Sequence, residues 1–407
     1  MDSRTRLLTA IKGEKPDHLP LYCWVFGFTP PKYLQWDENA HWYTMRLEHI
    51  HTLTEHWDIN QDFKRVDRFL SIGLDDVLDI SVPWSVHPDV TIKDWQEQSE
   101  SYPLICREYD TPAGKLQHIV RKTGETQDPG WVIQPDHVPI FEDFNIPRAI
   151  RHAFSEPDDI EKLRYILCEP TTIQVYDFKE RMSLIKKFAN ERGIMTQAWT
   201  AFGMDGVIWL SGVEKAITTA VENPDVFQEL VDLIFDFDKL RTDIMFSIGG
   251  ADMIVQRGWY SSTDFWSPAL FRKFVLPNLK ELVNMVHQAG KLFAYVMTTG
   301  LMPLLDQLKE SDIDLLYFVD PVQDNVDLRE FKHKLNGTFS VAGGINSGIT
   351  LRNGDPDEIS DAVHSAVDAF GTDGGFILSP VDALFPDTPE SSFEVMLNAW
   401  CEVRESK

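Results

Sequence analysis

The chain has 407 residues, of which 43% are hydrophobic, so it can bury a sizeable core. Its 38 basic and 64 acidic residues give a formal net charge of −26, which argues against binding to nucleic acid or to an anionic membrane surface. No apolar stretch approaches the roughly 20 residues of a membrane span, and the charged N-terminus does not resemble a signal peptide. The four cysteines form no C-x-x-C pair, which favours reduced thiols in the cytoplasm.

The first third of the chain predicts a helix at 3–11, a strand at 19–27, a helix at 41–57 and a strand at 75–84. Between about 92 and 140 the pattern changes. The stretch PLICREYDTPAGKLQHIVRKTG alternates and turns at DTPAG, which is typical of a β-hairpin. We interpret this part as a β-rich insertion outside the main repeat.

Helices and strands alternate from residue 157 onward. The predicted helices cover 178–192, 224–248, 268–289, 301–311, 327–335 and 356–370, and each leads into an apolar strand. Eight candidate strands separated by helical spacers predict an α/β fold, a parallel sheet closed into a TIM-type (β/α)8 barrel. We expect a single domain over residues 1–407.

In such a barrel the site is built from the carboxyl ends of the strands and the loops that follow them. Arg257 could hold a carboxylate or phosphate through two parallel hydrogen bonds, and Asp382 could act as acid/base, orienting group or ligand of a hard metal. Any one such residue could instead bond only to local backbone. The residues that follow the predicted strands are Gln256, Arg257, Trp259, Tyr260, Thr298, Thr299, Asp320, Gln323, Asn346, Ser379 and Asp382.

A metal site on the predicted helix at 41–57 is an alternative. EHIHTLTEHW places His51 and Glu55 four residues apart and therefore on one helix face. A solvated helix face explains this pattern better, and HExxH, a Gly-rich phosphate loop and GxSxG are all absent from the sequence.

Several longer stretches carry a family resemblance. FWSPALFRKFVLPNLKELVNMVHQAGKLF, DPVQDNVDLREFKHKLNG, VAGGINSGITLRNGDPDEI and GTDGGFILSPVDALFPDTPESS resemble the superfamily of uroporphyrinogen decarboxylases and corrinoid-dependent methyltransferases. LLTAIKGEKPDHLPL is similar to the opening of that family, and REYDTPAGKL to a hairpin of its methyltransferase-like branch. The resemblance implies the same barrel and an enzyme closer to the methyltransferase branch.

The departures from the family pattern narrow this expectation. Decarboxylases of the family have an Arg-rich stretch after the first strand, where this chain has Trp24, Val25 and Phe26. A porphyrinogen with many carboxylates would find few cations there. The methyltransferase branch binds zinc through His-x-Cys and a later Cys; the matching positions here are Met297, Thr299 and Asp382, so we expect no zinc.

The resemblance therefore implies methyl transfer between a small methylated compound and a corrinoid, carried by a partner protein, with no tightly bound cofactor. Asp382 would act as acid/base or orienting group with Arg257 and Tyr260; the substrate would contact Gln256, Trp259, Tyr295, Met297, Thr299, Asp320 and Gln323. Two alternatives stay open. One is a zinc-free decarboxylase or lyase acting on a small carboxylate or tetrapyrrole, with Arg257 as its clamp. The other is a non-catalytic binding protein. A homodimer is also left open.

Overall fold

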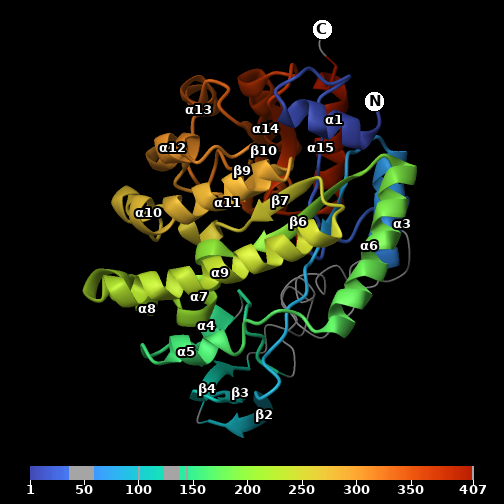
Figure 1. Ribbon diagram of the computed structural model, residues 1–407. Coiled ribbons are helices and arrows are strands. Elements are labelled where there is room, and N and C mark those ends of the chain that lie inside the picture. Colours follow the sequence, from blue (N-terminus) through green and yellow to red (C-terminus); the bar gives the residue numbers. More distant parts are fainter. Residues whose placement is uncertain (36–58, 100, 123–136, 144, 406–407) are drawn as a thin grey trace.

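The computed structural model describes residues 1–35, 59–99, 101–122, 137–143 and 145–405. Its centre is a parallel sheet that curls on itself (Figure 1). The spatial order of the strands is their order in the chain. The strands are β1 (Val77–Ile80), β6 (Met195–Ala201), β7 (Met253–Gln256), β8 (Leu292–Val296), β9 (Leu315–Val319), β10 (Ser340–Asn346) and β11 (Phe376–Val381).

The N-terminal segment fills the gap between the first and last strands of this sheet. Leu21 pairs in parallel with Leu378 of β11, and Tyr22 pairs in parallel with Asp75, just before β1. The segment predicted as a strand at 19–27 thus makes isolated bridges in the eighth position. The TIM-type barrel predicted from eight strand–helix units is confirmed, with a shorter N-terminal strand than expected.

Helices cover the outside of the curled sheet. α6 shows how the sequence defines one: Thr171 and Gln174 form a capping box at its start, and Gly193 ends it in the left-handed conformation. The single helix predicted over 268–289 is observed as two helices that are separated at Val275. Pro277 lies at the start of the second helix and has no backbone N–H to donate to the first. The helices are α1 (Ser3–Ile11), α3 (Ile59–Ser71), α6 (Thr172–Arg192), α7 (Gly203–Ser211), α8 (Val213–Glu222), α9 (Pro224–Ile248), α10 (Pro268–Phe274), α11 (Leu276–Gln288), α12 (Leu301–Glu310), α13 (Leu328–Leu335), α14 (Pro356–Phe370) and α15 (Glu390–Val403).

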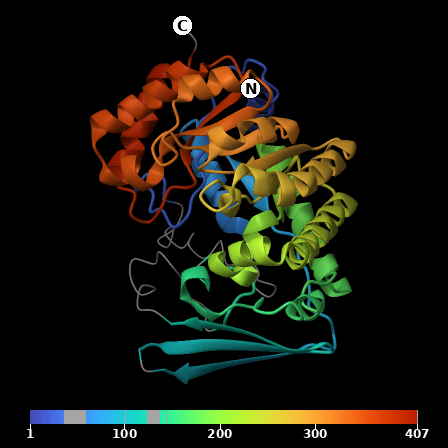
Figure 2. The same cartoon turned by 90° about the vertical axis from the view of Figure 1, so that its left-hand side faces the viewer.

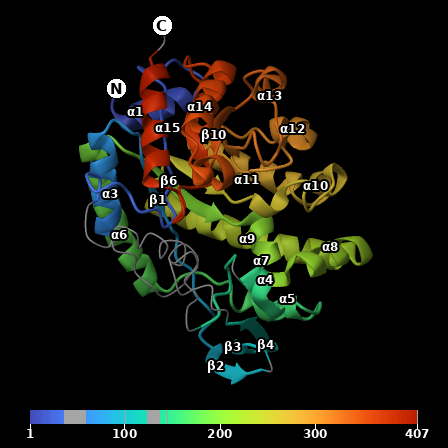
Figure 3. The ribbon, with the colours of Figure 1, turned by 180° about the vertical axis from the view of Figure 1, so that it is seen from behind.

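The last helix lies beside the start of the chain. Figure 3 shows α15 next to α14 and α1, and the two chain ends lie at the same end of the molecule. The indole N–H of Trp400 in α15 donates to the Leu19 carbonyl at 2.9 Å. The N-terminal segment is thereby held between α15 and the sheet. None of the helices in the described part of the chain combines the length and apolar character needed to cross a bilayer.

A second, antiparallel sheet projects from the barrel (Figure 2). It contains β2 (Thr91–Gln98), β3 (Pro103–Thr111), β4 (Gly114–Arg121) and the short β5 (Ala149–Arg151). β3 and β4 form the hairpin predicted from the DTPAG turn, with Thr111 opposite Gly114. Two short helices, α4 (Asn145–Arg148) and α5 (Asp159–Arg164), lie close to this sheet.

The barrel strands separate two apolar clusters. Ala294 and Val296 of β8 belong to the cluster inside the barrel, whereas Phe293 and Tyr295 belong to the layer between the strands and the helices. This alternation follows from the pleat, which directs successive side chains to opposite faces. It decides which of the predicted site residues face the barrel interior.

Candidate functional site

Arg257 follows β7 at the carboxyl end of the barrel and is held on all sides. Its Nε donates to Asp205 at 3.2 Å and its Nη2 to Asp143 at 3.1 Å. The guanidinium carbon lies over two indole rings, 4.5 Å from the centre of Trp209 and 4.4 Å from that of Trp259. Because its charge is matched by two carboxylates and its side chain is buried, Arg257 is not a free anion clamp.

Tyr260 belongs to the same cluster. Its amide N–H donates to Asp205 at 2.9 Å. Burial raises the pKa of Tyr260 above its usual value of 10, and the nearby Asp143 and Asp205 raise it further. The phenol therefore stays protonated at neutral pH and can act as a hydrogen-bond donor. Trp266 is buried, and its indole N–H donates to the Tyr260 carbonyl at 2.7 Å.

Asp382 follows β11 with a φ of 69°, a left-handed conformation that Asp tolerates better than most residues. Burial raises the pKa of its carboxyl to about 7, and Asp143 and Asp320 raise it as well. Arg257 and the indole N–H of Trp259 act in the opposite direction. Both protonation states of Asp382 are therefore accessible near neutral pH, as acid–base catalysis requires.

Three tryptophans lie in mutual contact beside this cluster inside the barrel. Trp24 stacks on Trp199 with ring centres 5.6 Å apart, and Trp259 lies 6.1 Å from Trp199 and 6.3 Å from Trp24. Asp79 of β1 accepts the indole N–H groups of Trp24 at 3.3 Å and Trp199 at 2.9 Å. The Trp24 that replaces the family's cations is thus part of an aromatic wall, with Trp259 as its partly exposed member.

Asp320 and Gln323 occupy the turn after β9. Asp320 accepts the amides of Val322 and Gln323 at 2.8 and 3.1 Å, and the side chain of Asn346 at 2.7 Å. These bonds fix the turn, as expected of a loop aspartate. The Gln323 side chain is exposed. The charge of Asp320 influences the site, because it raises the pKa of Asp382.

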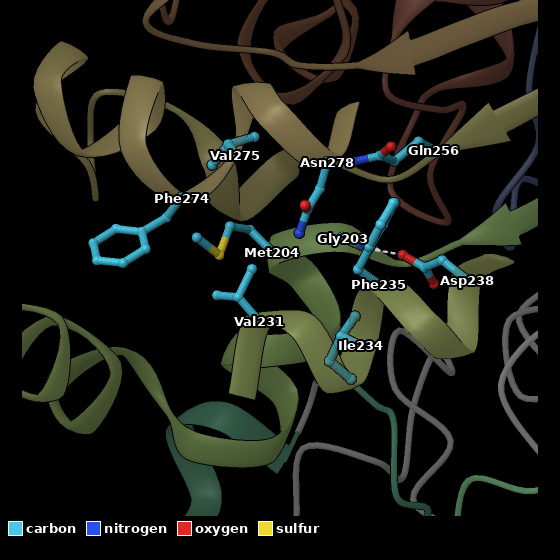
Figure 4. A pocket seen from close by; sticks show the side chains of 10 residues that line it. All are labelled: Gly203, Met204, Val231, Ile234, Phe235, Asp238, Gln256, Phe274, Val275 and Asn278. Carbon is cyan, nitrogen blue, oxygen red and sulfur yellow. Dashed lines mark hydrogen bonds between the residues drawn. The ribbon is translucent and has the colours of Figure 1, made fainter. Parts of the chain in front are cut away.

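Three other predicted residues face the helices and not the barrel interior. Tyr295 is fully buried, and its hydroxyl bonds to Ser261 at 2.6 Å. Met297 is also fully buried in the outer layer. Gln256 lines a cavity of about 20 Å³ between α7, α9, α10 and α11, together with Asn278 (Figure 4). We leave these three residues out of the site that we propose.

Thr299 lies beyond β8 and contacts a different acidic group. Its hydroxyl donates to Asp264 at 2.5 Å, and its oxygen lies 3.1 Å from the hydroxyl oxygen of Ser262. With Met297 turned outward and Thr299 bound to Asp264, the family's zinc positions do not present a thiolate- or imidazole-rich ligand set. The described residues contain no group of three or more His, Cys, Asp or Glu that could hold a metal. His51 and Glu55 lie outside the described residues.

The structure adds residues that sequence reasoning missed. Asp143 lies just beyond the predicted insertion, and Asp205 and Trp209 lie on α7, a helix for which we made no prediction. Trp199 lies near the end of β6 in a strand that was predicted, so its position relative to the strand end could have identified it. Asp143 carried no such signal because it follows no barrel strand.

The molecule is thus a (β/α)8-barrel protein. At the carboxyl ends of its strands it has an acid, Asp382, a phenol, Tyr260, and an arginine, Arg257, that is paired with two carboxylates. The chain matches the family model described as uroporphyrinogen decarboxylase (URO-D) over residues 140–403. This match covers more than half of the sequence, and the chain belongs to that family. The resemblance recognised in the sequence is confirmed.

A search of curated proteins finds no match. Among solved structures, the chain is similar to a methyltransferase from Methanosarcina mazei, with 16% identity, a TM-score of 0.58 and 99% of each chain covered. It is also similar to a B12-independent methionine synthase from Shewanella sp. W3-18-1, with 10% identity, a TM-score of 0.46, and 95% of this chain and 98% of that chain covered. The first likeness shows a fold shared over both whole chains.

Proposed function

We propose that the protein is an enzyme that transfers a methyl group from a small, uncharged methylated compound to an acceptor. The observation that carries the proposal is the state of Arg257, whose charge is matched by Asp205 and Asp143. A decarboxylase needs a cation for the substrate's carboxylate, and Arg257 is already paired. Family membership and the aromatic wall beside Asp382 support a methylated, apolar substrate.

Asp382 is the proposed general acid. When the methyl group leaves an ether oxygen, the C–O bond breaks, its electron pair stays on oxygen, and that oxygen takes a proton from Asp382. A carboxyl with a pKa of about 7 is well matched to this step near neutral pH. Tyr260 would donate a hydrogen bond to the same oxygen, and Trp259 would pack against the substrate.

The methyl acceptor is a co-substrate in this proposal. A corrinoid carried by a separate protein would supply a nucleophilic cobalt that accepts the methyl group. The residues described above hold and protonate the methyl donor, and no step of their chemistry requires zinc.

An assay with free, reduced cobalamin as acceptor tests the proposal. The protein is incubated with a panel of aryl and alkyl methyl ethers, and formation of methylcobalamin is followed by absorbance. We expect turnover with at least one ether, strongly reduced in Asp382→Asn and normal in Asp387→Asn. Asp387 lies five residues further on and forms an ion pair with Arg352 at 2.8 Å, so it is a matched control.

Two results would contradict the proposal. Release of carbon dioxide from a carboxylated aromatic compound, without methyl transfer, would favour the decarboxylase. Absence of both reactions, together with tight binding of a ligand, would favour a non-catalytic binding protein. We expect no formation of coproporphyrinogen from uroporphyrinogen, because the cations after the first strand are replaced by Trp24, Val25 and Phe26.

A further inference from the structure

We propose that Asp143 determines the charge selectivity of this site: it occupies Arg257 and so prevents the guanidinium from binding anionic substrates. The inference rests on the proposed function in one respect, because it takes the Arg257 end of the barrel as the place where substrate binds. It adds that an acidic residue from outside the strand–helix repeat excludes carboxylates.

The two carboxylates that hold Arg257 have different surroundings. Asp205 is fully buried and is fixed by a second bond from the Tyr260 amide. The side chain of Asp143 is 28% exposed and comes from the segment between β4 and α4. Asp205 is therefore the inner, permanent partner of Arg257. Asp143 stands on the side that solvent reaches, where a ligand would approach.

Asp143 is held in this place by two partners. One oxygen accepts the indole N–H of Trp209 at 2.7 Å, and the other accepts Arg257 Nη2 at 3.1 Å. A carboxylate with a donor on each oxygen has a defined position, so the contact with Arg257 belongs to a built arrangement and not to a surface ion pair that forms and breaks freely.

The same carboxylate acts on the proposed catalytic group. Asp143 raises the pKa of Asp382 and Arg257 lowers it, so both charges act on the carboxyl that would protonate the substrate. A ligand beside Asp382 meets an Arg257 whose positive charge is already matched by Asp205 and Asp143. An anionic ligand would also be repelled by Asp143, with no free cation to compensate.

Asp143→Asn removes the charge and keeps the shape of the side chain. Its amide oxygen can still accept one of the Trp209 or Arg257 bonds. Arg257 would then keep only Asp205 as an ionised partner, and its Nη2 at the solvent-facing end would be held by a neutral amide in place of a carboxylate. The variant should therefore bind anions that the wild type excludes, with Arg257 as the clamp.

Equilibrium binding of benzoate and of its uncharged analogue benzamide tests the inference, with tryptophan fluorescence and calorimetry as readouts. We expect Asp143→Asn to increase the ratio of benzoate to benzamide affinity by about tenfold or more, equivalent to roughly 1.4 kcal/mol. The gain should disappear in Asp143→Asn/Arg257→Gln. Asp143→Glu, which keeps the charge, should stay close to the wild type.

A matched control separates a specific effect from a general change of charge. Asp264→Asn also removes one carboxylate at this end of the barrel, but Asp264 bonds to Thr299 and not to Arg257. It should change the benzoate to benzamide ratio by less than about twofold. If Asp143→Asn does not fold, Asp143→Ala provides the same change of charge.

The inference is overturned if the charge-removing Asp143 variant that folds gains no benzoate affinity, or if Asp264→Asn gains as much. These measurements need no turnover. A failure of the methyl-transfer assay with a positive binding result would reject the proposed reaction and keep Asp143 as the charge filter. A positive methyl-transfer assay without a gain of benzoate affinity would keep the proposed reaction and reject Asp143 as the charge filter.

Discussion

Two buried arginines of this protein have similar partners and different roles. Arg65 on α3 bonds to Asp76 and, at 3.3 Å, to Asp62, and its side chain is 1% exposed. Arg257 also has two aspartates, but one of them, Asp143, is 28% exposed. The Arg65 cluster lies where β1 begins, and the Arg257 cluster lies where β7 ends.

The position along the strands explains the difference. In (β/α)8 barrels, charged groups at the amino ends of the strands serve stability, while groups at the carboxyl ends serve binding and catalysis. Arg65 fixes α3 to the start of β1 through Asp76 and the Val77 carbonyl at 3.2 Å. Arg257 is instead bordered by a titratable acid, a phenol and an aromatic wall. Residue type alone does not distinguish the two clusters.

The largest effect that we expect is a loss of stability when the Arg65 cluster is broken. Arg65→Met should lower the free energy of unfolding by about 3–5 kcal/mol, because it leaves two buried carboxylates without their cation. Urea denaturation followed by circular dichroism measures the change. Arg68→Met, on the exposed face of the same helix, should stay within about 0.5 kcal/mol of the wild type. Equal effects of the two variants would show that the Arg65 cluster is not structural.

Asp382→Asn tests the proposed catalytic role of the Arg257 cluster. We expect kcat to fall by about 100-fold or more, the low end for a general acid, with a change in unfolding free energy of no more than about 1 kcal/mol. Asn also tolerates the left-handed conformation at this position, so the backbone should be preserved. Near-normal turnover would remove Asp382 from the catalytic group and leave Tyr260 as the remaining acid.

The pH dependence of the wild type gives the protonation state that Asp382 needs. Its pKa is raised to about 7, so the acid form predominates below that pH. Activity should therefore be high below pH 7 and decline as pH rises through about 7. The declining limb should be absent from the residual activity of Asp382→Asn. Activity that increases through pH 7 would assign Asp382 the role of a base.

Asp143→Asn should affect stability least among the carboxylate variants of the two clusters. Because Asp143 is partly exposed, water can solvate the groups that lose its carboxylate. We therefore expect the free energy of unfolding to fall by about 1 kcal/mol or less. Asp76→Asn, at the fully buried partner of Arg65, should cost clearly more. Thermal melts of the two variants make this comparison directly, and a greater loss for Asp143→Asn would reverse our assignment of roles.

Metal content should not change between wild type and variants. We expect no stoichiometric zinc that depends on Asp382, because Met297 and Thr299 offer no suitable partner ligands. Elemental analysis of protein purified without chelators measures this. About one zinc per chain, lost in Asp382→Ala, would contradict it.

The barrel could be predicted from the sequence because each strand and helix has its own periodic signal. The hairpin was predicted for the same reason, from its alternation and its turn. The direction of side chains at the strand ends was harder to predict. Tyr295 and Met297 alternate with Ala294 and Val296, and in a strand buried on both faces all four are apolar, so the sequence does not indicate which pair faces inward.

The partners of Arg257 could not be predicted either. Asp143 lies 114 residues before Arg257, and Asp205 lies 52 residues before Arg257. No local sequence pattern links these residues. Arg257 was therefore interpreted as a candidate clamp, whereas the structure shows its charge already matched. Long-range pairing of charges depends on tertiary packing, which periodicity does not encode.

The N-terminal bridges of the barrel have a consequence for the order of folding. Leu21 pairs with Leu378, so the contact that closes the ring joins residues from opposite ends of the chain. Contacts between residues so far apart in sequence form slowly, because a long loop must be closed first. During synthesis the first segment must wait until the last strand has left the ribosome, and a chain truncated before β11 would keep an open sheet with two unpaired edges.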